Sequence, residues 1–291
     1  MHIAQALADA QARGVARLDA QLLLAHLLGR PRAWLLAHDD EELTPEKTAT
    51  LAAWVARRLQ GEPLAYIAGE HEFCGLALHV GPAVLVPRPE TELLVEWALE
   101  CLGESAQAGV VDLGTGSGAI ALALKQARPK LQVCASDSSA AALAVARGNG
   151  LRHGFEVEWQ LGDWWAPWAH RRFALVVSNP PYVAGDDTHL AALAHEPRAA
   201  LTPGGDGLAA LRRITLGAPL HLLPGAWLLL EHGHDQGPAV RGLLSAAGFV
   251  GAQTRVDLAG LPRCSGAVWQ GANQGANKYR RSKGYPAVTG Q

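Results

Sequence analysis

The sequence predicts an α/β protein in which a mostly parallel, Rossmann-like sheet follows a small helical domain and ends in an antiparallel hairpin. Three observations favour this fold. From residue 109 onward, strand-like apolar runs alternate with helix-like segments, the rhythm of a sheet with helices on both faces. Residues 1 to about 60 show apolar residues at helical spacing instead. The last two strand-like runs have no helix between them, which is typical of a hairpin.

Composition bounds the class of protein. A chain of 291 residues suggests two domains, and an apolar content of 49% allows a sizeable core. The net charge of −2 argues against a protein dominated by phosphate contacts. The four cysteines are far apart and form no Cys-x-x-Cys pair, which is typical of reduced thiols. Because no apolar run approaches the ~18 residues that span a bilayer and no signal pattern opens the chain, we expect a cytoplasmic protein without a membrane partner.

The first predicted unit, residues 1–62, is helical. Thr44 is a candidate N-cap, and Pro45 occupies the first position of its helix. The acidic run 39–42 is expected to be a solvated loop. Apolar residues recur at four-residue spacing in two stretches: Leu18, Leu22, Ala25 and Gly29, then Leu51, Val55 and Leu59.

A β-hairpin linker is predicted over residues 63–90. The stretches "LAYIAGEHEF" and "LALHVGPAVLV" show a period of two on either side of Gly75. "PRPETE" then introduces a helix over residues 93–102.

The third predicted unit, residues 91–270, holds the sheet. Its expected strands are Val110–Leu113, Leu131–Ala135, Val157–Leu161, Leu175–Ser178 and Ala226–Glu231. Helical segments separate most of them, among them Ala119–Ala127, Ala140–Gly148 and Gly237–Ala247. Thr254–Val256 and Ser265–Gln270 form the terminal hairpin. Residues 271–291 are rich in Gly, Asn and Gln, then basic, and we expect them to be disordered.

A glycine-rich turn follows the first strand of this sheet. "VVDLGTGSGAIALAL" contains a buried strand, a turn and a helix, and its glycines allow a ligand to lie against bare N–H groups. An acidic residue, Asp137, follows Gly114 by 23 positions, near the offset at which a carboxylate meets ribose hydroxyls. The predicted cofactor-binding residues of this turn are Gly114, Thr115, Gly116, Ser117 and Gly118.

The turn alone does not separate a dinucleotide from S-adenosylmethionine, since Gly114, Gly116 and Ala119 also satisfy the dinucleotide fingerprint. A Gly-x-Gly-x-Gly spacing after an acidic strand end favours S-adenosylmethionine, with Asp112 near its ammonium group. After the third strand, "GDWW" offers Asp163 to accept from the adenine amino group and Trp164 to lie against the ring.

"SNPPYV" follows the fourth strand, at the rim where ligands bind in open α/β sheets. Pro180 and Pro181 fix the backbone and remove two donors while keeping their carbonyl oxygens. The Asn179 side-chain oxygen and one main-chain carbonyl form two fixed acceptors, which match the two hydrogens of an –NH₂ group. Tyr182 supplies a flat face for the planar system behind that amino group. We therefore predict that Asn179, Pro180 and Tyr182 are catalytic and that Asn179, Pro180, Pro181 and Tyr182 bind the substrate.

This clamp suits methyl transfer to an amide or aromatic amine, whose nitrogen lone pair is delocalised. Two acceptors can hold both N–H bonds so that the lone pair faces an electrophilic methyl group, and the reaction then depends on positioning. No metal is expected. Glu231, His232, His234 and Asp235 are adjacent on a strand end, and side chains that alternate faces rarely converge on one ion.

The chain resembles the HemK/PrmC-type protein-(glutamine) methyltransferases from about residue 4 to 270. The resemblance rests on "VPRPETELLVEWAL", "DLGTGSGAIALAL", "SDSS", "GDWW", "VSNPPYV", "HEPRAAL" and "LLLEHG". Asn-Pro-Pro-Tyr alone is shared with adenine-modifying DNA methyltransferases, whereas its combination with "PRPETE" and "EPRAAL" is more specific. Two positions depart from the family pattern: His195 replaces a frequent aromatic, and Thr188 replaces a usual proline.

The resemblance implies a Rossmann-like S-adenosylmethionine-dependent methyltransferase that modifies the glutamine of the Gly-Gly-Gln loop of peptide chain release factors. S-adenosyl-L-methionine would become S-adenosyl-L-homocysteine. Gly114–Gly118, Asp137, Trp164 and Asn179 would contact the cofactor, Asn179 to Tyr182 would hold the glutamine amide, and the helical domain would grip the release factor.

Two alternatives remain at this point. An adenine amino-group methyltransferase acting on nucleic acid would share the cofactor site and the clamp but should carry a basic surface. Residues 1–90 carry 8 Lys and Arg against 11 Asp and Glu, so no stable nucleic-acid partner is expected. A non-catalytic protein that binds an adenosine ligand would show no methyl transfer at all.

Overall fold

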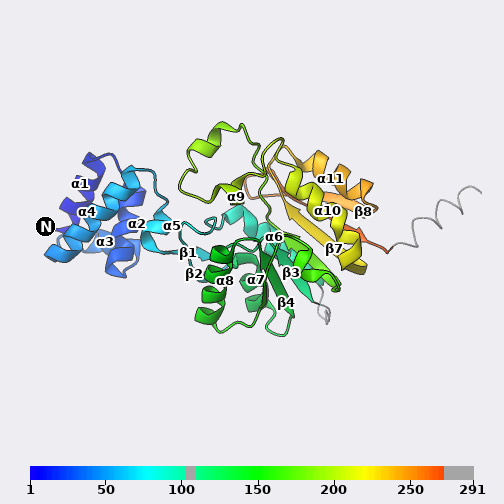
Figure 1. The fold of residues 1–291 in the computed structure, drawn as a ribbon. Coiled ribbons are helices and arrows are strands. Elements are labelled where there is room, and N and C mark those ends of the chain that lie inside the picture. Colours follow the sequence, from blue (N-terminus) through cyan, green and yellow to red (C-terminus); the bar gives the residue numbers. More distant parts are fainter. Residues whose placement is uncertain (103–108, 272–291) are drawn as a thin grey trace, which may run out of the picture.

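The structure is a computed structural model that describes residues 1–102 and 109–271. The tail predicted over residues 271–291 lies outside the described residues except for Gly271. The amino-terminal helices form a separate cluster at one end of the molecule, and the sheet with its covering helices forms the larger part (Figure 1).

The amino-terminal cluster surrounds its own apolar core, in which Ile3, Leu24, Leu51 and Val55 are buried. The helices predicted here are present. Leu18 and Leu22, however, lie on the exposed face of α2, while its neighbouring positions face the core. The elements are α1 (Ile3–Ala12), α2 (Arg17–Leu28), α3 (Arg32–Ala37), α4 (Pro45–Leu59) and α5 (Leu64–Ala68).

The predicted start of one helix in this cluster is confirmed, and a loop completes the hydrogen bonding at the start of another. The Thr44 hydroxyl accepts a hydrogen bond from Lys47 N at 3.3 Å, and Pro45 begins α4. Residues 39–42 form an exposed loop, as predicted. Its main-chain oxygens accept from the first amides of α1, which have no partner within the helix: Ile3 N donates to Glu41 O and Ala4 N to Asp39 O.

The connecting segment differs in part from its prediction. The hairpin is present as β1 (Glu70–Phe73) and β2 (Leu76–His79), but the preceding Leu64–Ala68 forms α5 instead of a strand. Three consecutive α5 residues are buried: Ala65, Tyr66 and Ile67. Ile67 packs into the amino-terminal core and Tyr66 into a second cluster, so contacts on two sides override the two-residue period.

The described residues form one seven-stranded sheet in the order β5-β4-β3-β6-β7-β9-β8. The first five strands of this order are parallel, and β9 runs antiparallel between β7 and β8. The terminal hairpin at the sheet edge is thereby confirmed. The strands are β3 (Val110–Leu113), β4 (Val133–Asp137), β5 (Glu158–Leu161), β6 (Phe173–Ser178), β7 (Leu222–Glu231), β8 (Val250–Val256) and β9 (Pro262–Trp269).

Helices cover both faces of the sheet (Figure 1), and two apolar clusters mark the two sides. Val110 belongs to the cluster with α6 and α7, and its neighbour Val111 to the cluster with α10 and α11, so β3 is buried on both faces. The helices are α6 (Glu92–Leu102), α7 (Ala119–Ala127), α8 (Ala140–His153), α9 (Arg198–Leu201), α10 (Ala209–His221) and α11 (Gly237–Ala246), with short 3-10 turns η1 (Pro89–Thr91), η2 (Ala166–Trp168) and η3 (Thr188–Ala191).

Some element bounds differ from the sequence prediction. Strand β4 begins two residues later than expected and ends at Asp137, which places that carboxylate on the strand's last residue. Helix α10 was not named from the sequence, and it contains Pro219 near its carboxyl end. None of the helices in the described ranges is long and apolar enough to cross a membrane.

Candidate active site

The glycine-rich turn connects β3 to α7 at the carboxyl edge of the sheet. Gly116 has a φ of 57°, in the left-handed region, and a Cβ built on it would meet no atom within 4 Å. It lines the main pocket of this edge, so its bare backbone faces open space. Glycine is favoured at Gly118 because its φ of 85° is also left-handed and a Cβ there would lie only 3.2 Å from the Leu122 side chain.

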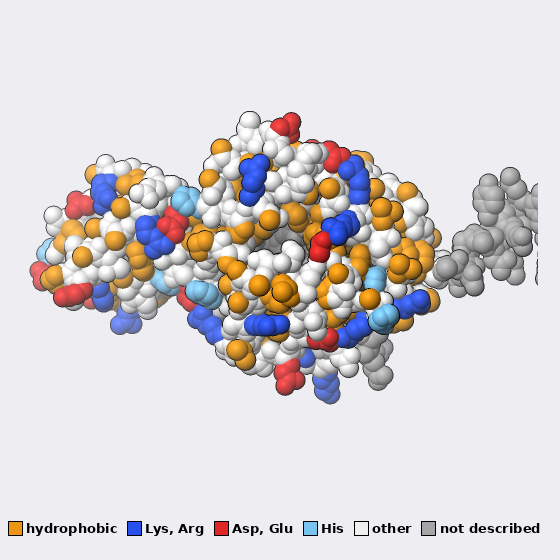
Figure 2. Space-filling view, in the orientation of Figure 1, with side chains coloured by type: hydrophobic (Ala, Val, Ile, Leu, Met, Phe, Trp, Pro, Cys, Tyr) orange, Lys and Arg blue, Asp and Glu red, His pale blue; other side chains and the backbone are white. Residues whose placement is uncertain are grey.

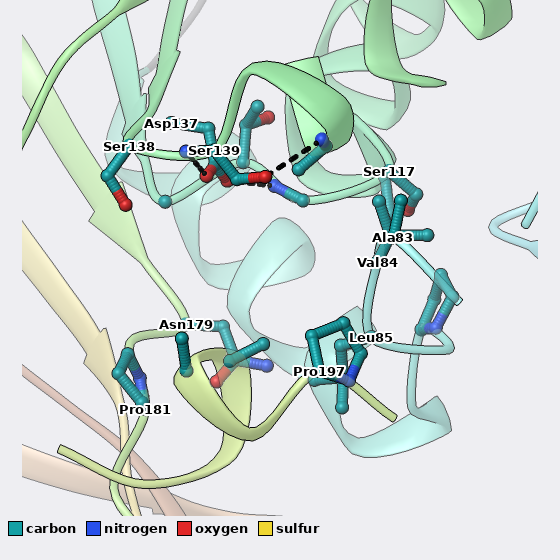
Figure 3. A pocket seen from close by; sticks show the side chains of 18 of the residues that line it. Ala83, Val84, Leu85, Ser117, Asp137, Ser138, Ser139, Asn179, Pro181 and Pro197 are labelled. Atoms are coloured by element: carbon teal, nitrogen blue, oxygen red, sulfur yellow. Dashed lines mark hydrogen bonds between the residues drawn. The ribbon is translucent and has the colours of Figure 1, made fainter. Parts of the chain in front are cut away.

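Asp137 fixes this turn from the end of β4. One carboxylate oxygen accepts from Gly116 N at 2.9 Å and the other from Ser139 N at 2.8 Å. Burial raises the pKa of Asp137, while these backbone hydrogen bonds act in the opposite direction. Asp137 and Ser139 lie on one wall of the pocket (Figure 3), where the predicted ribose contact requires a carboxylate.

Asp112 lies beneath the turn and does not line the pocket. Thr115 Oγ1 donates to its Oδ2 at 2.6 Å, and Oδ1 has no hydrogen-bond partner among the described residues. Burial raises the pKa of Asp112 to about 7. Thr115 itself lines the pocket, so the predicted influence of Asp112 on a ligand would pass through this hydroxyl.

The two residues of "GDWW" that were predicted to contact adenine lie in different places. Trp164 lines the pocket, and a Cβ on Gly114 would meet its ring at 3.3 Å. Asp163 is not a lining residue: its Oδ2 pairs with Arg213 at 2.7 Å, and its side chain is 45% exposed. The positive φ of 48° at Trp164 turns the chain between them. The structure therefore brings Trp164, and not Asp163, to the pocket wall.

The Asn-Pro-Pro-Tyr segment follows β6 and forms the opposite wall. Asn179 and Pro181 line the pocket across from Asp137 (Figure 3). Asn179 Nδ2 donates to Thr91 Oγ1 at 3.2 Å, which leaves Oδ1 as the free acceptor. Pro180 is buried behind this wall.

Tyr182 is turned toward the interior. Its hydroxyl donates to Glu231 Oε1 at 3.2 Å, and its main-chain oxygen accepts from Gln236 Nε2 at 3.0 Å. Burial and the Glu231 carboxylate raise the pKa of the Tyr182 hydroxyl, so it stays a donor. Tyr182 does not line the pocket, and the flat face predicted from its ring is not part of this wall.

The remaining wall was missed by residue-level reasoning. Ala83–Leu85 come from the linker, Thr91 from η1 just after it, and Pro197, Ala199 and Ala200 from the segment before and within α9. Glu196 holds them together: its Oε2 accepts from Val86 N at 3.0 Å, and its Oε1 pairs with Arg88. "PRPETE" and "EPRAAL" contributed to the family resemblance but were not predicted to line the pocket. Neither motif contains a local signal that the two segments meet.

Metal ligation finds no support around β7. Across residues 1–102 and 109–271 there is no group of three or more His, Cys, Asp or Glu that could hold an ion. His232 Nδ1 donates to Gly233 O at 2.8 Å, and its Nε2 accepts from Ser265 Oγ at 2.7 Å. Both ring nitrogens of His232 are therefore engaged, and Nε2 joins the end of β7 to β9.

Two family descriptions match the chain. Residues 1–69 match the PrmC N-terminal domain, and residues 90–216 match the methyltransferase small domain. The chain is 53% identical over 256 residues to the release factor glutamine methyltransferase of Bordetella pertussis, which covers 87% of this chain and 95% of that protein. It is 49% identical to the release factor glutamine methyltransferase of Xylella fastidiosa, over 87% of this chain and 93% of that one.

Solved structures support the fold. The T. thermophilus 16S rRNA N2 G1207 methyltransferase, in complex with AdoMet and guanosine, aligns with a TM-score of 0.51 at 21% identity. The alignment covers 69% of this chain and 49% of that one.

Proposed function

The chain belongs to the release factor glutamine methyltransferase family, and from that premise we propose that it transfers a methyl group to the side-chain amide nitrogen of the glutamine in the Gly-Gly-Gln motif of peptide chain release factors. The observation that supports this most directly is the pocket itself. One wall carries Asp137, which is hydrogen-bonded to the glycine-rich turn, and the facing wall carries Asn179 (Figure 3). Trp164 lines the pocket with its ring next to Gly114 of that turn. A nucleoside-bearing donor and a planar amide acceptor would therefore meet in one cavity.

The donor site fits S-adenosyl-L-methionine. Gly116 leaves the space that a Cβ would occupy, and Asp137 is fixed by two backbone amides with its carboxylate at the wall. Gly114–Gly118, Asp137, Trp164 and Asn179 would hold this cofactor. When bound, it supplies a methyl group on a positively charged sulfur and leaves as S-adenosyl-L-homocysteine.

The acceptor site is built to hold an –NH₂ group. Since Thr91 Oγ1 occupies Asn179 Nδ2, the Asn179 Oδ1 can accept one amide hydrogen, and the Pro180 carbonyl is proposed to accept the other. Holding both N–H bonds leaves the nitrogen lone pair directed at the donor side. One N–H bond is exchanged for an N–CH₃ bond and the proton passes to solvent, so catalysis rests on orientation.

We further propose that residues 1–62 recognise the release factor, residues 63–90 link the two units, and residues 91–270 carry out the transfer. A cytoplasmic location stays a prediction, and the four cysteines, which are free thiols in this structure, support it.

Action on adenine in nucleic acid is not favoured. The relatives named above are release factor glutamine methyltransferases. On the face drawn in Figure 2, Lys and Arg are interspersed with Asp and Glu, and no basic stripe crosses it. Nucleic-acid enzymes generally carry such a stripe because phosphate contacts dominate their affinity.

The proposal is tested by incubating the protein with S-adenosyl-L-methionine labelled on the methyl group. The acceptors are a release factor, the same factor with the Gly-Gly-Gln glutamine replaced by alanine, and duplex DNA. We expect label only on the unaltered release factor. Equal labelling of the alanine variant would contradict the proposed acceptor, and label on DNA would favour the alternative.

A further inference from the structure

Glu231 is a buried carboxylate beside the amide clamp that no step above has used. It ends β7, is 1% exposed, and accepts from the Tyr182 hydroxyl through Oε1. Its Oε2 has no hydrogen-bond partner among the described residues. Burying a carboxylate oxygen without a hydrogen-bond donor is unfavourable, so its retention at this place calls for a reason.

Thr91 lies between this carboxylate and Asn179 in the proposed order. It is 3% exposed and lies in η1, at the start of α6. Its oxygen accepts from Asn179 Nδ2 at 3.2 Å, and Thr91 is among the groups that lower the pKa of Glu231. Within the described residues no hydrogen bond joins the Thr91 hydroxyl to Glu231, whose Oε2 is an acceptor without a donor. The Thr91 hydroxyl hydrogen is therefore the group that can join the Tyr182–Glu231 pair to the Thr91–Asn179 pair.

The direction of these hydrogen bonds decides whether the accepting or the donating end of the Asn179 amide faces the substrate. An asparagine amide has an accepting end and a donating end, and rotation by half a turn exchanges them. A hydroxyl oxygen can accept from Asn179 Nδ2 while its own hydrogen is given elsewhere. An ionised carboxylate only accepts, and it is therefore the partner that fixes the Thr91 hydrogen on the side away from Asn179.

We propose that Glu231 is a positioning residue that sets the orientation of the Asn179 amide. It takes the Thr91 hydroxyl hydrogen, so the Thr91 oxygen must accept from Asn179 Nδ2, and Asn179 Oδ1 is left facing the substrate as an acceptor. The Tyr182 hydroxyl gives the carboxylate a second hydrogen bond. Tyr182 would therefore act by holding Glu231, and not by contacting the substrate. The inference rests on the proposed methyl transfer to an amide.

The hydrogen-bond relay from Glu231 through Thr91 to Asn179 should depend on pH, because Glu231 must be ionised to accept the Thr91 hydrogen. Burial raises the pKa of Glu231 to about 7, whereas Thr91, Tyr182 and Arg263 lower it and Glu90 raises it further. A protonated Glu231 would have to donate its hydrogen, which would compete with Thr91 or Tyr182 for the same role. Because the ionised fraction grows with pH, kcat should rise as pH passes through about 7. Cys264 also faces this carboxylate, whose charge helps keep the thiol protonated.

The test compares Glu231→Gln with the wild-type protein on a release factor. The glutamine keeps the shape of the side chain but has a donating NH₂ group, which reverses the direction of the bonds. We expect kcat to fall on the order of 10²-fold, as when one positioned hydrogen-bonding group is lost. The Kd of S-adenosyl-L-methionine and the KM of the release factor should change less than about threefold. The rise of kcat through about pH 7 should also disappear.

Glu100→Gln is the matched control, because it makes the same chemical change at a surface residue paired with Arg255. It should behave as the wild-type protein does. If Glu231→Gln fails to fold, the pair Thr91→Val and Thr91→Ser takes its place. Valine removes the hydroxyl and should lower kcat similarly, while serine should restore most of it.

Each outcome has one meaning. If the wild-type protein labels the release factor and Glu231→Gln matches it in kcat and pH profile, the relay is wrong while the proposed function stands. Full kcat in Thr91→Val has the same meaning. If the wild-type protein labels no glutamine, the proposed function itself fails.

Discussion

At the scale of single residues, the hydrogen bonds that a side chain already makes decide whether it can face the pocket. Asn179 and Tyr182 are three positions apart in the sequence, yet one faces the pocket and the other faces Glu231. Asp163 and Trp164 are adjacent, and they also separate. The type of a motif residue therefore indicates which chemistry it can do. Its hydrogen-bond partners in the fold decide which of its atoms a ligand can reach.

Replacing Asn179 with alanine tests the clamp. The variant loses the acceptor for the amide hydrogen, so we expect kcat to fall on the order of 10²–10³-fold. Cofactor affinity, measured by calorimetry with S-adenosyl-L-methionine, should fall much less than kcat, because the glycine-rich turn, Asp137 and Trp164 still hold the cofactor. Asp163→Asn is the control, because Asp163 pairs with Arg213 outside the pocket, and its kcat should stay near that of the wild-type protein. A non-catalytic binding protein would show no turnover in any of the three proteins.

Asp112 predicts a pH dependence of stability. Its folded pKa of about 7 lies above the ordinary value of 3.8, so between these values the folded state holds a proton that the unfolded state has lost. Stability is therefore lost as pH rises through this window. Asp112→Asn keeps the shape without titrating, and it should reduce the loss in unfolding free energy between about pH 5 and pH 8 on the order of 2–3 kcal/mol.

The measurement is urea unfolding of both proteins without cofactor at the two pH values. An equal loss in Asp112→Asn would show that Asp112 is not protonated in the folded state.

At the scale of elements, close packing places the terminal hairpin. Strand β9 inserts between β7 and β8 directly opposite α6. A Cβ on Gly266 would lie 2.4 Å from the Leu229 side chain and 3.0 Å from the Trp97 ring. The strand therefore reaches its place only because this position has no side chain.

Gly266→Ala should accordingly destabilise the protein. Overpacking of a core costs about 1–3 kcal/mol, since neighbours must move to admit the methyl group. Thermal unfolding followed by circular dichroism measures it. Gly242→Ala is the matched control: it lies in α11, and its Cβ would meet no atom within 4 Å, so helix propensity should leave the protein equally or more stable. A Gly266→Ala protein with the wild-type melting temperature would contradict the packing argument.

At the scale of the whole molecule, three segments far apart in the sequence meet beside the pocket. Glu196 binds the linker through Val86 N and Arg88. Next to it, His195 Nε2 donates to the main-chain oxygen of Gln60 at 2.9 Å, which reaches the amino-terminal helices. The position of His195, noted as a departure from the family pattern, is thus a contact between the two units.

Glu196→Ala should affect both stability and cofactor binding. It leaves the buried Val86 N–H without a partner, at a cost of about 1–3 kcal/mol in unfolding free energy. Because Ala83–Leu85 line the pocket and depend on this anchor, the Kd of S-adenosyl-L-methionine should also rise. Glu158→Gln, at an exposed ion pair with Arg171, is the control and should change neither quantity. If stability fell while the Kd stayed unchanged, Glu196 would not be needed to shape the cofactor pocket.

The sequence by itself determined the succession of most strands and helices along the chain, the glycine-rich turn, Asp137 and the Asn-Pro-Pro-Tyr segment. These follow from local causes: buried strands read as apolar runs, and glycine and proline restrict the backbone wherever they occur. The family could be identified at that level, and Asn179 could be predicted as the residue that binds the amide, because a short motif carries its own chemistry.

Tertiary structure alone decided α5, the outward turn of Asp163, and the meeting of Thr91, Glu196 and Glu231 at the site. Residues 64–68 became a helix because packing on two sides outweighed their alternating pattern. Thr91 and Asn179 are separated by 88 positions, and Val86 and Glu196 by 110. Contacts over such distances depend on how the whole chain packs, and no short stretch of sequence records them.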